Sequence, residues 1–260
     1  MEVSQATREK FGFKFGRSGA HSARSMMLAE LQQLFEFMEP GAGQAEYQQA
    51  IVEFNRLNKP TDKARKLTYR HLVDLYGMSP EVPLFRVMRR LWPLESEAQP
   101  ILALQSALAR DPLLRLSMPF ITSTKSGEAV SREQVEEILK RQDPDRFSPA
   151  SLKSFAQNIN GSWTQAGFLK GKAKKVRVDP AISPINIAFA LFLGYLEGAT
   201  GERLLHSAWC QLLTSDGHRL QELATASSHR GIIDFRQSGG VTEVRFPGFL
   251  TAEEEGWLHE

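Results

Sequence analysis

Apolar residues recur at spacings of three and four through most of the first 110 positions, a pattern typical of amphipathic helices. The first such stretch covers residues 20–38 and ends before Pro40 and Gly41. Further helices are predicted over 44–57, from a cap at Thr61 and Asp62 to Tyr76, after Pro83, and over 97–110. Because no alternating strand pattern interrupts them, segment 1–110 is predicted to be a helical bundle.

Segment 111–180 combines helices with a short hairpin. A short helix is predicted over 113–121. The later boundaries are a capping box at Ser131 and Gln134, a turn at Asp143-Pro-Asp, a cap and proline at Ser148 and Pro149, a stop at Gly167, and a polar turn over 170–172. Two helices and a longer third one, followed by a hairpin, predict a winged-helix-like domain.

A similar order recurs in segment 181–260. Helices are predicted over 184–197, 202–213 and 217–229, and strands over 232–236 and 241–246 flank a turn with two glycines. We therefore predict a mainly α fold, in which a helical N-terminal bundle is followed by two winged-helix-like modules with short β-hairpins.

Composition places the chain among ordinary globular proteins, with 42% hydrophobic and 24% charged residues. The single cysteine, Cys210, cannot form an internal disulfide, which fits a reducing compartment and a buried thiol. The most apolar run, 185–196, is shorter than the roughly 20 residues that a membrane span needs. The N-terminus also lacks the apolar core of a signal peptide. These features predict a cytoplasmic protein without membrane contact.

Charge is distributed unevenly along the chain although the net charge is only +2. Residues 1–90 carry 14 basic and 10 acidic side chains, residues 91–180 carry 13 and 10, and residues 181–260 carry 5 and 10. An excess of positive charge in the first two thirds is consistent with one part of the molecule meeting a polyanion.

The most basic stretch lies between Phe147 and Val178, where no acidic residue occurs. Its predicted hairpin carries five basic residues, which can each neutralise a phosphate: Lys170, Lys172, Lys174, Lys175 and Arg177. The helix before it offers side chains able to contact phosphates or base edges, among them Lys153, Gln157 and Asn160. This pattern predicts nucleic-acid binding. The alternative interpretation is a solvated basic loop.

Two further segments offer phosphate contacts. The Gly/Ser-rich run from Gly16 to Arg24, with Arg17 and His21, precedes a predicted helix and could bind phosphate, although a capping turn is the favoured interpretation. On the 61–76 helix, Lys66 and Arg70 share a face that is either a second contact surface or an ordinary exposed side.

The sequence offers little support for catalysis. Six scattered histidines show neither HExxH nor HxH spacing, and no nucleophile–base pair can be named from the sequence. We therefore predict a protein that is not an enzyme and holds neither a metal nor a cofactor.

One run carries a family resemblance. Phe147-Ser-Pro-Ala-Ser-Leu-Lys, then Asn158, Trp163 and the Gln165-Ala-Gly-Phe-Leu turn into the basic segment, resembles the second half of BrxA-type proteins of bacterial BREX phage-defence islands. The 61–75 helix followed by Pro83-Leu-Phe-Arg is similar to their first half, and the overlap spans about residues 55–200. The resemblance implies winged-helix-like modules, double-stranded DNA binding and no known enzymatic activity.

The function expected from these observations is a non-enzymatic DNA-binding component of a bacterial anti-phage, BREX-like defence system. Its partners would be double-stranded DNA and other defence-system proteins. Two alternatives stay open. The first is a protein–protein adaptor subunit of a defence complex, which the excess of acidic residues in the last third of the chain favours. The second is a winged-helix transcriptional regulator.

Overall fold

The N-terminal part of the chain is helical in the computed structural model, which describes residues 3–142, 144 and 146–259. Its elements are α1 (Gln5–Phe11), η1 (Ala20–Ser22), α2 (Leu28–Phe37), α3 (Gln44–Gln48), the π-helical turn η2 (Gln49–Glu53), α4 (Asp62–Tyr76), α5 (Pro83–Leu91), η3 (Trp92–Leu94), η4 (Ser96–Ala98) and α6 (Gln99–Arg110). The prediction of an all-helical segment 1–110 is confirmed in outline.

The helix predicted over 20–38 is interrupted at its start. Only η1 forms near residue 20, and α2 begins at Leu28 after Met27, whose φ is 55°. The cause is tertiary: the His21 N–H donates to Asp111 Oδ2 at 2.9 Å and the Met26 N–H to Ser162 Oγ at 2.8 Å. These amides therefore bind distant side chains rather than carbonyls one turn earlier.

The middle part consists of α7 (Pro112–Leu116), α8 (Met118–Ser123), β1 (Ala129–Val130), α9 (Arg132–Gln142), α10 (Pro149–Gln165), β2 (Leu169–Lys170) and β3 (Lys175–Arg177). The strands form an antiparallel sheet in the order β1-β3-β2. Strand β1 is absent from the sequence prediction, and the predicted 113–121 helix is two helices. The turn predicted at Asp143-Pro-Asp includes residues 143 and 145, which lie outside the described residues.

The predicted caps are confirmed. The Gln134 N–H donates to Ser131 Oγ and the Ser131 N–H donates to Gln134 Oε1, at 3.1 and 2.7 Å. The Ser148 and Thr61 side chains accept from the N–H groups of Ser151 and Ala64. Each cap satisfies an amide that the first helical turn leaves unpaired.

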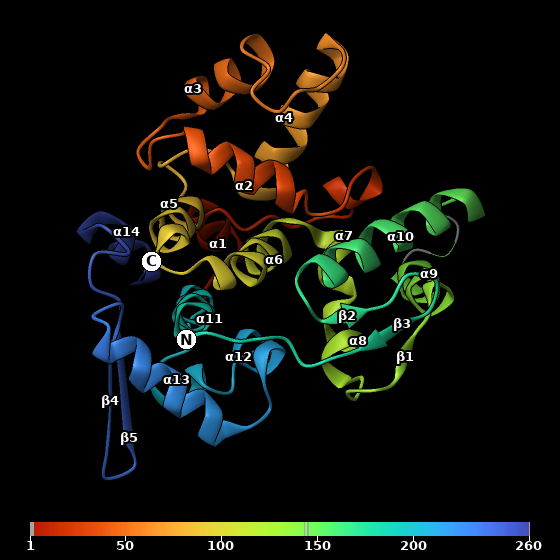
Figure 1. Ribbon diagram of the computed structural model, residues 1–260. Coiled ribbons are helices and arrows are strands. Elements are labelled where there is room, and N and C mark those ends of the chain that lie inside the picture. The colour runs from red at the N-terminus through yellow and green to blue at the C-terminus, as the bar shows by residue number, and fades with distance from the viewer. Residues whose placement is uncertain (1–2, 143, 145, 260) are drawn as a thin grey trace.

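The C-terminal part contains α11 (Pro184–Leu196), η5 (Gly201–Leu204), α12 (Ala208–Leu213), α13 (Gly217–His229), β4 (Asp234–Ser238), β5 (Val241–Arg245), α14 (Ala252–Gly256) and η6 (Trp257–His259). The hairpin β4–β5 turns at Gly239 and Gly240 and projects from the body of the molecule (Figure 1). Strand β4 begins two residues after the predicted start at 232, and β5 begins at 241 as predicted.

Helices α6 and α11 lie in the middle of the molecule, with α2–α4 on one side and α12–α13 on the other (Figure 1). Almost every α11 side chain is buried, as expected for its apolar run, and Cys210 is buried too. Buried side chains from Val3 to Leu258 form one hydrophobic cluster that includes all three predicted segments. The boundaries at 110 and 180 stay a prediction. Along the described ranges, every helix is too short or too polar to cross a bilayer.

Candidate nucleic-acid interface

Helix α10 has a buried stripe and a solvent-facing stripe. Leu152, Ala156, Ile159 and Trp163 are buried at helical spacing, and the Trp163 indole N–H donates to Ser117 Oγ at 2.8 Å. Lys153 and Gln157 are exposed on another face. The helix is therefore anchored in the core along one side and accessible along another.

Residues 20–28 cover a third side of α10. The Asn158 side-chain amide donates to His21 O at 3.0 Å, and that of Gln165 donates to Ser25 Oγ at 3.1 Å. These contacts fix the N-terminal segment against the helix and leave the Lys153–Gln157 stripe open.

The β2–β3 turn carries lysines into solvent next to this stripe. Gly171 has a φ of +111°, and a Cβ there would lie 2.1 Å from Lys174 O, so the turn requires glycine. The Lys175 Nζ donates to Gly171 O at 2.8 Å and closes the turn. Lys170, Lys172 and Lys174 are exposed.

A groove of about 570 Å³ joins the turn to the helix. One wall is α10 with Gln157, Asn160 and Gly161, and the other is the turn with Lys172, Lys174 and Lys175. Residues 129–133, which contain β1 and the start of α9, also line it. Figure 1 shows α10, α9 and the β1–β3 sheet together in one corner of the molecule. Five of the predicted contact residues therefore share one groove.

The acidic groups at or near the groove pair with arginines. Glu133 lines the groove and pairs with Arg132 at 2.6 Å, and Asp179 lies 3.9 Å from Arg177. Within the described part of the chain, none of the ion pairs includes Lys153, Lys170, Lys172, Lys174 or Lys175. The lysines of the turn are therefore not paired with carboxylates among the described residues.

Arg177 was predicted to contact phosphate at the surface, but its side chain is buried. It is 7% exposed, its Nε donates to Ile121 O at 3.1 Å, and its Nη1 donates to Val178 O. Its guanidinium also lies 5.2 Å from the centre of the Phe168 ring, and burial lowers its pKa. Arg177 therefore holds the sheet onto α8 rather than facing solvent. Asn160 is also mostly buried, with its Oδ1 unpaired at the groove.

The other predicted contacts lie apart from the groove. Lys66 is exposed and pairs with Asp62 at 2.8 Å on α4. Arg70, one turn later, lines a second pocket together with Ser18, Gly19 and Ser22, so the structure brings the Gly/Ser-rich loop and α4 together. Arg24 is exposed close to His71. Arg17 lies on the far side of that loop, where its carbonyl accepts from Arg146 Nη1 at 2.7 Å.

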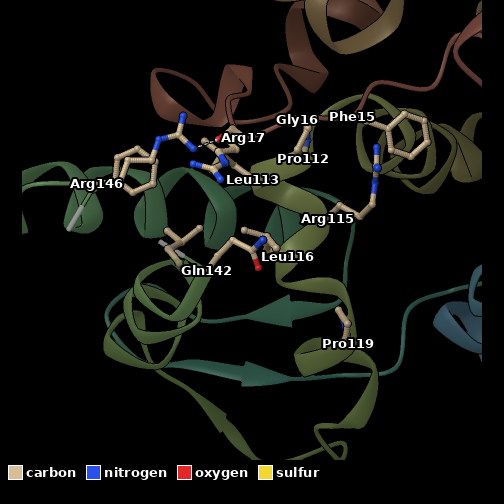
Figure 2. Close-up of a pocket in the computed structure, with 12 residues that line it drawn as sticks. Phe15, Gly16, Arg17, Pro112, Leu113, Arg115, Leu116, Pro119, Gln142 and Arg146 are labelled. Atoms are coloured by element: carbon tan, nitrogen blue, oxygen red, sulfur yellow. Dashed lines mark hydrogen bonds between the residues drawn. The ribbon is translucent and has the colours of Figure 1, made fainter. Parts of the chain in front are cut away.

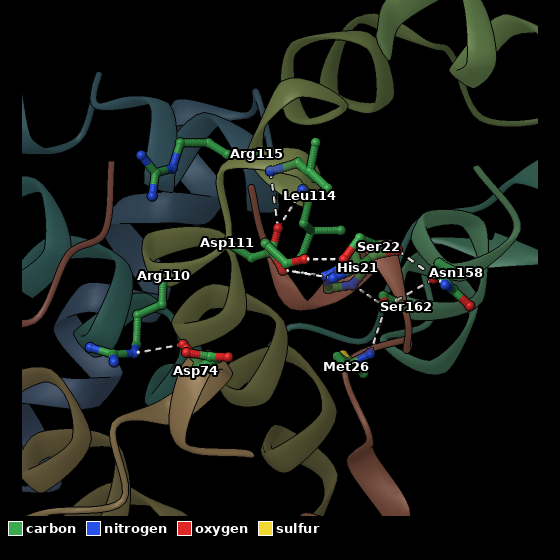
Figure 3. Close-up of polar contacts among 12 residues, drawn as sticks. His21, Ser22, Met26, Asp74, Arg110, Asp111, Leu114, Arg115, Asn158 and Ser162 are labelled. Atoms are coloured by element: carbon green, nitrogen blue, oxygen red, sulfur yellow. Dashed lines mark hydrogen bonds and ion pairs between the residues drawn. The ribbon is translucent and has the colours of Figure 1, made fainter. Parts of the chain in front are cut away.

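His21, which the sequence suggested as part of a phosphate-binding loop, does not face solvent. It is fully buried, with Nδ1 2.9 Å from Asp111 Oδ2 and Nε2 2.7 Å from Ser162 Oγ (Figure 3). This is the hydrogen-bond order of a Ser-His-Asp triad, which sequence reasoning missed because the three residues are far apart in the chain. Ser162 Oγ already accepts the Met26 N–H, and all three side chains are sealed from solvent. The cluster fastens the loop to α7 and α10.

Asp111 is the charged end of this cluster and also caps α7. Its Oδ1 accepts the N–H groups of Leu113 and Leu114 at 3.0 and 3.1 Å. Burial would raise the pKa of Asp111, but attraction to His21 and the hydrogen bonds from His21 and Leu114 together lower it. The carboxylate is therefore ionised and fully paired.

An apolar pocket of about 290 Å³ lies between the N-terminal loop, α7 and the end of α9. Figure 2 shows Pro112, Leu113 and Leu116 along it, with Arg17 and Arg146 at one end. Arg115 donates to the carbonyls of Leu108, Ala109 and Lys14, so its guanidinium is used in the fold.

The described residues contain no group of three or more His, Cys, Asp or Glu side chains placed to hold a metal ion. In comparisons with known proteins, no family model matches the chain, and no curated protein matches it either.

Proposed function

We propose that the protein is a non-enzymatic double-stranded DNA-binding protein and that the groove between α10 and the β2–β3 turn is its contact surface. The observation that carries the proposal is the position of Lys172 and Lys174, opposite Gln157 of an accessible helix. Both lysines are exposed, and neither has a carboxylate partner among the described residues. Lysines on one wall can contact the phosphates of a duplex, and amide side chains of the helix on the other wall can contact base edges.

The order of elements supports the same proposal. Helix α8, β1, α9, α10, β2 and β3 follow one another as in a winged helix, with β3 between the other two strands. In that comparison α10 takes the place of the recognition helix and the β2–β3 turn that of the wing. The second series, α11, α12, α13 and β4–β5, is proposed as a further winged-helix-like module.

Because phosphate contacts release counterions, the proposal is tested by measuring how the affinity for DNA depends on salt concentration. We would reverse Lys172 and Lys174 to Glu and measure binding of a random duplex by fluorescence anisotropy over a series of salt concentrations. Lys175 stays unchanged because its Nζ closes the turn. Affinity should fall, and the slope of log K against log salt should decrease by roughly two, since each neutralised phosphate contributes about 0.9.

The matched control reverses Lys125 and Lys140, which are exposed and lie outside the groove lining. It changes the net charge by the same amount, so its affinity should fall less and its slope should stay near that of the parent. An unchanged affinity and slope in the Lys172/Lys174 variant would refute the groove as the contact surface.

The biological setting rests on the family resemblance: a component of a bacterial anti-phage, BREX-like system, acting in the cytoplasm beside other defence proteins. Deleting the gene from its host and plating phage tests this. Unchanged plating efficiency with the rest of the defence system intact would count against it.

A protein–protein adaptor is the second candidate, favoured by the β4–β5 hairpin. Val241 is 70% exposed at the tip of this projecting hairpin, and acidic side chains such as Asp234 and Glu243 are exposed along it. Partner subunits that co-purify after nuclease treatment, and are lost when Val241 is changed to Lys, would support the adaptor.

A further inference from the structure

A second polar pocket, separate from the groove, lies between the loop that follows α1 and the C-terminal half of α4. Its volume is about 460 Å³, within the range of small-molecule sites. The loop contributes Lys14, Ser18 and Gly19, and α4 contributes Arg70, His71 and Asp74. Loop and helix are therefore brought together by the fold although they are about fifty residues apart.

The loop reaches this position because of Gly19. A Cβ on that residue would lie 2.0 Å from Asp111 Oδ1, so any other side chain would push the loop off the carboxylate. Since Asp111 also holds His21, the buried cluster described above fixes one wall of the pocket. The pocket is thus built on an anchored loop.

Positive charge exceeds negative charge around the pocket. Lys14, Arg70 and Arg110 face one carboxylate, Asp74, which already pairs with Lys14 at 2.8 Å. Arg110 donates to backbone carbonyls, among them Asp74 O at 3.2 Å (Figure 3). Burial lowers the pKa of Arg110 to about 10, with Asp74 opposing the change, so the guanidinium stays charged near neutral pH. The surplus favours an anion.

His71, which lines the pocket, has a buried ring nitrogen without a hydrogen-bond partner among the described residues. His71 is 7% exposed, and its Nδ1 has no hydrogen bond among the described residues. A buried polar atom left unpaired costs free energy, which a ligand able to bond it would recover. Burial and the positive charges of Arg70 and Arg24, opposed by Asp74, lower the pKa of His71. A neutral ring can carry its hydrogen on Nδ1 and donate it.

These groups match the oxygens of a phosphate. Arg70 is exposed at the rim and can donate two parallel hydrogen bonds, Ser18 offers a hydroxyl, and His71 offers one ring N–H. A dianion fits the surplus of two positive charges better than a single carboxylate does. The pocket is larger than phosphate needs, and Phe15 supplies an apolar wall for the rest of the ligand.

We propose that the pocket between the 14–22 loop and α4 binds a phosphate monoester, with Arg70, His71 and Ser18 as its contacts. The phosphate can belong to a small molecule of nucleotide size or to the 5′ end of a nucleic-acid strand. This site is independent of the groove proposed for duplex binding, because none of the residues named here lines that groove.

The experiment is calorimetric titration of the full chain with inorganic phosphate, adenosine 5′-monophosphate and adenosine. Phosphate and the monophosphate should bind, and adenosine should not. Changing Arg70 to Glu should weaken monophosphate binding roughly tenfold or more, because a charge-assisted hydrogen bond is lost. Lys63→Glu is the matched control, since it makes the same charge change on an exposed position of the same helix. It should bind nearly as well as the parent.

Histidine NMR provides a readout that does not depend on a variant. The Nδ1 resonance of His71 should shift when phosphate or the monophosphate is added, and the resonance of exposed His229 should not. A short strand with a 5′ phosphate is then compared with the same strand ending in a hydroxyl. Tighter binding of the phosphorylated strand identifies strand ends as the source, and equal binding identifies a small molecule.

The groove variant separates this proposal from the proposed function. The Lys172/Lys174 double Glu variant should bind the monophosphate like the parent even where its duplex affinity is lost. Three results would refute the phosphate site: phosphate and the monophosphate fail to bind, the His71 resonance does not shift, or Arg70→Glu and Lys63→Glu lose binding equally. None of these results would contradict duplex binding in the groove.

Discussion

His21 Nε2 lies 2.7 Å from Ser162 Oγ, and this contact ties the N-terminal loop to the helix that carries the proposed DNA-binding surface. The two residues are separated by 141 positions. Because Asp111 holds the other side of the same ring, three separate segments meet in a single buried hydrogen-bonded chain (Figure 3). The loop, α7 and α10 therefore depend on one another for their positions.

Removing His21 should destabilise the whole protein. His21→Ala leaves the Asp111 carboxylate buried without its ring partner and Ser162 without one contact. We expect a loss of about 3 kcal/mol in the free energy of unfolding, as for breaking one side of a buried pair. Urea denaturation measures it, with exposed His229→Ala as the control, which should change stability by less than about 0.5 kcal/mol. Equal stabilities of the two variants would contradict a structural role for the cluster.

Asp111 should make the fold sensitive to acid. Its pKa in the folded protein is below the ordinary 3.8, although burial alone would raise it, because His21 and backbone N–H groups stabilise the carboxylate. Below pH 3.8 the unfolded state therefore binds a proton before the folded state does. The stabilisation is complete above that pH and is lost as the pH falls through the folded pKa.

The free energy of unfolding, measured between pH 6 and the acid transition, should fall less steeply for Asp111→Asn than for the parent below about pH 4. The variant is less stable at neutral pH, so the comparison concerns the slope. Parallel curves would mean that Asp111 does not titrate differently in the two states.

Helix boundaries in this chain were predictable because they depend on neighbours in sequence. The Ser131–Gln134 and Ser148–Ser151 caps join residues three positions apart, so the residue types and their spacing in the sequence are enough to predict them. The order of α9, α10 and the β2–β3 hairpin was also indicated by local signals. The predicted site lysines at 172 and 174 share the groove for the same reason, since the turn itself exposes them.

What could not be predicted depends on distant pairing. Strand β1 has two residues, and it exists because Ala129 and Val130 pair with β3 some 45 positions later. Arg177 belongs to a basic run, yet its strand position points it to the carbonyl of Ile121. His71 lies on an ordinary amphipathic helix, and only the loop packed against it makes a pocket.

Arg177 and Lys174 should respond in opposite ways to loss of charge. Arg177→Met removes donors from the buried carbonyl of Ile121 and the half-buried carbonyl of Val178, and should cost about 2–3 kcal/mol of stability. Lys174→Met removes an exposed charge and should change stability by less than about 0.5 kcal/mol while weakening duplex binding. Thermal unfolding and anisotropy are measured on both. If Arg177→Met is as stable as the parent but binds duplex weakly, Arg177 contacts DNA and the structural role given to it here is wrong.

Gly171 should be needed for the shape of the turn. Its φ is +111°, and an added Cβ would lie 2.1 Å from Lys174 O, so Gly171→Ala must reshape the turn that presents the lysines. We expect a loss of about 2 kcal/mol in stability together with weaker duplex binding. Gly127→Ala is the matched control, because its φ is +91° but no atom lies within 4 Å of the added Cβ. It shares the cost of the backbone conformation without the collision. If both variants lose the same stability and keep the same duplex affinity, the turn does not position the lysines, and their effect on binding comes from charge alone.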